Sequence, residues 1–62
     1  MPIIEVNLLE GRTQEQKRKL VAAMTQAVVQ SLNTKPEAVR ILLRDMKKSD
    51  YSVAGVMEAD KK

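Results

Sequence analysis

The hydrophobic period changes once, early in the chain, and this change limits the folds that the sequence can adopt. In residues 3–9, IIEVNLL, successive side chains alternate between two faces, and several of them are β-branched. This period of two is typical of a strand. Residues 14–32 instead repeat apolar side chains at four-residue steps, which predicts an amphipathic helix. Thr13 with Gln16 predicts a capping box at its start, and Asn33 suits a left-handed residue that ends it.

The segment EAVRILLRDM, residues 37–46, fits two structures. As a strand it places Ile41 and Leu43 on one face, and as a helix it aligns Leu42 with Met46. The apolar run is only about eight residues long, and this length favours the strand. Strand, helix and strand in this order predict an α/β (α+β) chain built on a short βαβ unit with parallel strands.

A lone βαβ unit leaves one face of its sheet uncovered. We expect that face to carry Ile3, Leu9 and Leu42, and a two-stranded sheet with a bare apolar face is not stable alone. The chain has 62 residues, which predicts a single domain over 1–62, and it contains no Cys or His. Disulfides and the common zinc ligand sets are therefore excluded, and self-association is the remaining source of stability. We expect the tail after residue 50 to form a hairpin, or an arm that reaches a neighbouring subunit.

Composition argues against two classes of partner. The net charge is only +3 with both signs interspersed, and Tyr51 is the single aromatic residue, so no nucleic-acid partner is expected. No stretch has the length of a membrane span or the pattern of a signal peptide, so we expect no membrane partner and a cytoplasmic location.

Three residues stand out as candidates for chemistry. Pro2 either starts a strand harmlessly or, once Met1 is removed, supplies a secondary amine at the tip of an ordered element. Arg12 lies between the first strand and the helix cap, and Arg40 lies within an apolar run where a charge needs a partner. Each arginine fits a surface ion pair or a clamp for a carboxylate, because the guanidinium fork matches that group.

Several short motifs resemble the 4-oxalocrotonate tautomerase family across the whole chain. They are the proline behind the methionine, LLEGRT, the following EQK, SL at the helix end, VR in the second strand and an aromatic residue before the C-terminal turn. The resemblance implies a tautomerase-like fold and a homohexamer, a trimer of dimers whose sites draw residues from neighbouring chains. It also implies catalysis without a cofactor.

The resemblance assigns a role to each candidate residue by position. It makes Pro2 the general base, Arg12 the ligand of a distal carboxylate, and Arg40 the contact of the 2-oxygen and the nearby carboxylate. Such a site takes a small dicarboxylate or 2-oxo acid, such as 2-hydroxymuconate, and isomerises it. The remaining matches are to apolar walls around the substrate: Leu9, Tyr51 and Val53.

A proline amine must be uncharged to act as a base near neutral pH. Burial among apolar side chains and repulsion from Arg12 and Arg40 would both lower the pKa of the Pro2 amine. The chain also departs from the family: Ala38 stands where some members have serine, and Tyr51 replaces a phenylalanine. These departures affect the prediction of the exact substrate more than the prediction of the reaction type.

Two other functions are compatible with parts of the sequence. A ribbon-helix-helix DNA-binding dimer would need residues 38–46 to be helical, and its strand would offer an acid and aliphatics to the groove. A tautomerase-like subunit with another proline-based activity, such as haloacrylate hydration, would need a carboxylate to activate water. The sequence does not identify such a carboxylate.

Overall fold

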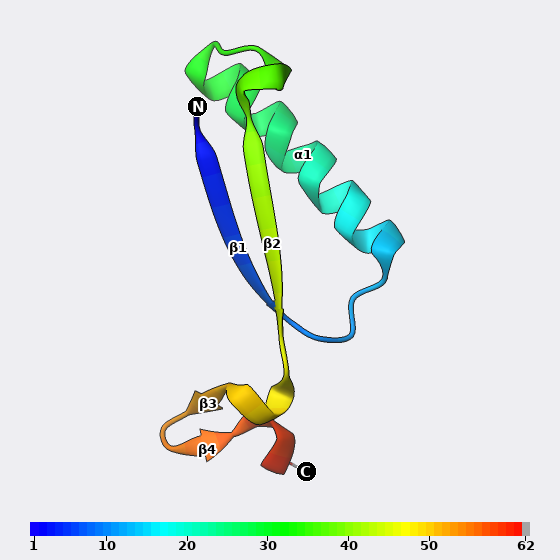
Figure 1. Ribbon diagram of the computed structural model, residues 1–62, viewed down its shortest axis with the longest axis vertical. Coiled ribbons are helices and arrows are strands. Elements are labelled where there is room, and N and C mark those ends of the chain that lie inside the picture. The colour runs from blue at the N-terminus through cyan, green and yellow to red at the C-terminus, as the bar shows by residue number, and fades with distance from the viewer. Residues whose placement is uncertain (62) are drawn as a thin grey trace.

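The computed structural model describes residues 1–61, which form a βαβ unit followed by a small hairpin (Figure 1). The unit consists of strand β1 (Ile3–Leu9), helix α1 (Gln14–Leu32) and strand β2 (Arg40–Met46). The hairpin pairs β3 (Ser52–Val53) with β4 (Val56–Met57) and lies at the end of the molecule opposite the N-terminus. Three short 3₁₀ helices complete the chain: η1 (Pro36–Ala38), η2 (Lys48–Asp50) and η3 (Glu58–Asp60).

Helix α1 begins and ends at the predicted residues. The Thr13 hydroxyl accepts the Gln16 N–H at 3.1 Å, and the Gln16 side chain accepts the Thr13 N–H at 3.0 Å, so the capping box is complete. Asn33 ends the helix with φ of 53°, in the left-handed region. Within residues 1–61, neither α1 nor any other helix is long and apolar enough to cross a bilayer.

The second apolar segment is a strand, as its length predicted. β1 and β2 are parallel and pair without a bulge, from Ile3 opposite Arg40 to Leu9 opposite Met46. The pairing uses the segment that the ribbon-helix-helix alternative required as a helix, so that alternative is wrong. A parallel sheet with a helical crossover is the predicted arrangement.

The two faces of the sheet differ in exposure. Val6 and Leu8 are half-buried on the side that α1 covers, whereas Ile3 and Leu42 are 55% and 45% exposed on the other side. The prediction for Leu9 was wrong in part, since this residue is half-buried where β1 turns into the following loop. None of residues 1–61 is buried, so the described chain has no core of its own. This observation agrees with the expectation that other chains cover the bare face.

The β3–β4 hairpin turns through two residues of positive φ, Ala54 at 55° and Gly55 at 83°. This geometry matches a type I′ turn, in which glycine is favoured and alanine is strained by its Cβ. We expect Ala54→Asn to raise the free energy of unfolding by about 0.5–1 kcal/mol, because asparagine tolerates the left-handed region. Thermal unfolding at one protein concentration measures the effect. Ala54→Val should lower stability instead, and equal melting temperatures for both variants would contradict the explanation.

Candidate active site

Pro2 and Arg40 are neighbours at the N-terminal end of the sheet. The Pro2 carbonyl accepts the Arg40 N–H at 3.0 Å, and Pro2 is half-buried. Arg40 is exposed and is the first residue of β2, not an interior member of the apolar run, and its Nη1 donates to the Ala38 carbonyl at 3.4 Å. This position costs the charge little desolvation, so Arg40 is free of the penalty that an interior position would impose.

Arg12 lies at the opposite end of β1, in the loop that leads into α1. Gly11 precedes it with φ of 114°, a conformation that side chains rarely adopt, which explains the glycine of the LEGR segment. Arg12 borders a hollow of about 290 Å³ between the end of β1 and the first turns of α1. The residues lining it are Leu8, Arg12, Gln16, Lys17 and Leu20.

A second, more open hollow of about 560 Å³ lies between the same loop and the C-terminal segment. Its lining includes Leu9, Arg12 and Glu58, together with Leu8, Glu10, Gly11 and Lys48. Tyr51 and Val53 belong to the adjoining segment, and Val53 is 49% exposed. Across residues 1–61, no three acidic side chains converge closely enough to hold a metal ion.

The structure thus divides the predicted site residues between two ends of one chain (Figure 1). Pro2 and Arg40 meet at the start of the strands, and Leu9 and Arg12 lie at the far end of β1. A seven-residue strand spans about 20 Å, which is too far for one small substrate to bridge. Pro2 and Arg12 of the same chain therefore cannot serve one substrate molecule in this fold.

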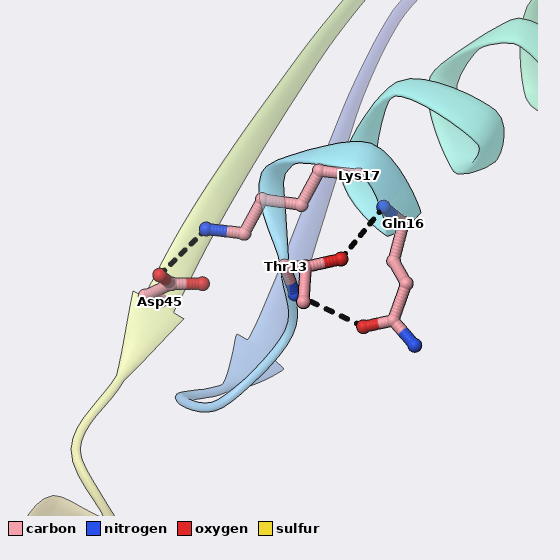
Figure 2. A network of polar contacts seen from close by, with 4 residues as sticks. All are labelled: Thr13, Gln16, Lys17 and Asp45. Carbon is pink, nitrogen blue, oxygen red and sulfur yellow. Dashed lines mark hydrogen bonds and ion pairs between the residues drawn. The ribbon is translucent and has the colours of Figure 1, made fainter.

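Lys17 is a contact that the sequence reasoning missed. Its Nζ lies 2.7 Å from Oδ2 of Asp45, and the pair joins the first turn of α1 to the end of β2 (Figure 2). A cation in the first helical turn opposes the helix dipole, and this unusual position was the signal that a carboxylate lies nearby. The ion pair links the helix start to β2, and Lys17 also lines the hollow beside Arg12.

Glu10 is a second missed contact. Its N–H donates to the Met46 carbonyl at 2.8 Å, and its carboxylate accepts the Lys48 N–H at 2.9 Å. Parallel strands bring their carboxyl ends to the same edge of the sheet, so the residues that follow Leu9 and Met46 are expected to lie close together. Glu10 therefore ties the Arg12 loop to the 3₁₀ helix that leads to Tyr51 and Val53.

Removing the Glu10 carboxylate should loosen this connection. We expect Glu10→Ala to speed hydrogen exchange of the Lys48 amide at least about fivefold, since one such hydrogen bond contributes about 1 kcal/mol or more. Glu10→Gln keeps an acceptor oxygen and should stay near the wild-type rate. Amide exchange followed by NMR measures both variants, and an unchanged rate in Glu10→Ala would show that the contact does not hold the segment.

Comparisons with known proteins identify the family and the fold of this chain. A family model described as "Tautomerase enzyme" matches residues 2–61. A probable tautomerase of Staphylococcus saprophyticus is 47% identical over 60 residues, which cover 97% of this chain and 98% of that protein. A solved structure among the 4-oxalocrotonate tautomerase isozymes of Methylibium petroleiphilum is 55% identical, with a TM-score of 0.91 and coverage of 94% and 91%. A subunit of the heterohexameric 4-oxalocrotonate tautomerase of Chloroflexus aurantiacus is 26% identical, with a TM-score of 0.94 and full coverage of both chains. This chain therefore belongs to the tautomerase enzyme family.

Proposed function

We propose that the chain is a cofactor-free isomerase that interconverts 2-hydroxymuconate-type dienols and their conjugated 2-oxo isomers. Pro2 acts as the general base once Met1 has been removed. The observation that carries the proposal is the hydrogen bond between the Pro2 carbonyl and the Arg40 N–H, which holds the Arg40 backbone beside Pro2 at the start of β2. The likeness to the Methylibium petroleiphilum isozymes supports the substrate class.

The reaction moves one proton and leaves the atom count unchanged. The uncharged Pro2 nitrogen takes the proton of the 2-hydroxyl group, the electron pair shifts along the conjugated chain, and Pro2 returns the proton to a distant carbon. Negative charge develops on the 2-oxygen during the transfer, and the Arg40 guanidinium stabilises it. Arg12 binds the distal carboxylate through its guanidinium fork.

The proposed site is shared between chains. Because Arg12 and Pro2 lie at opposite ends of β1, a neighbouring chain in the reverse direction would bring its Arg12 end to the Pro2 end of the first chain. Leu9, Tyr51 and Val53 of neighbouring chains would then form apolar walls around the substrate. We propose a homohexamer, a trimer of dimers, and the heterohexamer of the relative from Chloroflexus aurantiacus supports this assembly.

The decisive experiment joins an intact-mass measurement with an ultraviolet assay. The mass identifies chains that begin at Pro2, and those chains should convert 2-hydroxymuconate with a change in its ultraviolet spectrum. Pro2→Ala or Arg40→Ala should lower kcat/KM at least about tenfold, as expected for a base or an oxyanion donor. Arg18→Ala, on the exposed face of α1, is the matched control and should leave the rate unchanged. Equal rates for the wild type, Pro2→Ala and Arg40→Ala would disprove the mechanism.

A further inference from the structure

The bare face of the sheet carries an ion pair at its centre. Arg44 and Glu5 make two contacts of 3.4 Å, Nη1 to Oε2 and Nη2 to Oε1, so the ion pair is bidentate. Glu5 is opposite Leu42 and Asn7 is opposite Arg44, which makes the pair a diagonal contact between β1 and β2. Both charged side chains are about half exposed, at 54% and 52%.

In a single chain this pair would contribute little, because water screens exposed charges. The apolar side chains around it change the argument. Ile3 and Leu42 stand on the same face, and no side chain in residues 1–61 is buried, so the face needs a cover. Whatever covers Ile3 and Leu42 also removes water from Glu5 and Arg44, and two buried charges require partners.

We propose that the Glu5–Arg44 pair is the polar centre of the surface through which copies of this chain associate, and that it selects a second copy of the same chain as the partner. In an interface with twofold symmetry, the same patch meets itself, so each Glu5 can approach the Arg44 of the other copy. The guanidinium has five N–H donors and offers further ones beyond those that serve Glu5. A partner without this charge pattern would leave the pair desolvated and incompletely hydrogen-bonded.

The inference rests on the association proposed above, and its test measures association alone. The first variants are Glu5→Gln and Arg44→Gln, each of which leaves one charge without its partner. A dilution series in sedimentation velocity measures the dissociation constant of the assembly. This constant should be at least about tenfold higher in each variant than in the wild type, as expected when one partner of a desolvated pair is removed. The matched control removes an ion pair from the outer face of α1: Glu15→Gln, whose contact with Arg18 is 3.9 Å. It should associate as strongly as the wild type.

The exchanged variant Glu5→Arg/Arg44→Glu tests the proposal even if the single variants fold poorly. It should restore self-association to near the wild-type strength, because the pair is reversed within each chain. When wild-type and exchanged chains are refolded together, native mass spectrometry should find them sorted into separate assemblies, since like charges would meet across a mixed interface.

Three results would overturn the inference, and none depends on enzymatic activity. The first is wild-type association in both single variants, and the second is an exchanged variant that remains as weak as they are. The third is free mixing of wild-type and exchanged chains, which would show that the pair makes no contact across the interface. A failed ultraviolet assay would disprove the proposed function while leaving these three measurements intact.

Discussion

Refolding Pro2→Ala chains together with Arg12→Ala chains is expected to restore activity that neither variant has alone. Each variant should lose at least about tenfold in kcat/KM, because each removes the base or the carboxylate ligand. In mixed assemblies, some sites combine the intact Pro2 of one chain with the intact Arg12 of the other. Random association makes these about one quarter of all sites, so about one quarter of the wild-type rate should return.

The control for this experiment replaces the Arg12→Ala chain with the double variant Pro2→Ala/Arg12→Ala. No chain in that mixture carries Pro2, so the rate should stay low. The ultraviolet assay with 2-hydroxymuconate measures both mixtures. If the mixture of Pro2→Ala and Arg12→Ala chains stayed as inactive as the control mixture, Pro2 and Arg12 would have to act from the same chain. That result would contradict their separation along β1.

Leu42→Asp should abolish association and most of the folded structure. Leu42 lies on the bare face, opposite Glu5, so the new carboxylate would be desolvated in the assembly and next to a like charge. Such a penalty of several kcal/mol is comparable to the whole stability of a small domain, about 5 kcal/mol. We therefore expect loss of the helical circular-dichroism signal together with loss of the oligomer in sedimentation.

Two controls separate this effect from the mere addition of a charge. Leu42→Met conserves volume and should associate normally, and Gln26→Asp adds the same charge on the exposed side of α1. A Leu42→Asp chain that folds and associates like Gln26→Asp would show that the sheet face stays in water. The role proposed for that face in assembly would then be wrong.

The secondary structure could be predicted well because its signals are local. The change of period located β1 and α1, the capping box located the helix start, and Asn33 marked the helix end. The exposure of Ile3 and Leu42 also followed from the pattern, since alternate residues of a strand face opposite sides.

Other features depended on contacts between distant residues. The hydrogen bond from Lys48 to Glu10 and the ion pair of Lys17 with Asp45 join segments 28 to 38 residues apart. Their formation requires the parallel register, which the sequence pattern does not state residue by residue. The exposure of Arg40 was likewise unpredictable, because it depends on where β2 begins.

The amino-acid sequence alone predicted the strands of the βαβ unit and its helix, and the lack of Cys and His led us to expect association with other chains. It also placed the candidate residues in the family pattern, because chemistry of this kind depends on residue types at fixed separations. The tertiary structure decided how those residues divide in space. The parallel pairing of β1 with β2 puts Pro2 beside Arg40 and keeps Arg12 a full strand length away. The physical reason is that a strand is extended and rigid, so distance along it becomes distance in space that only another chain can bridge.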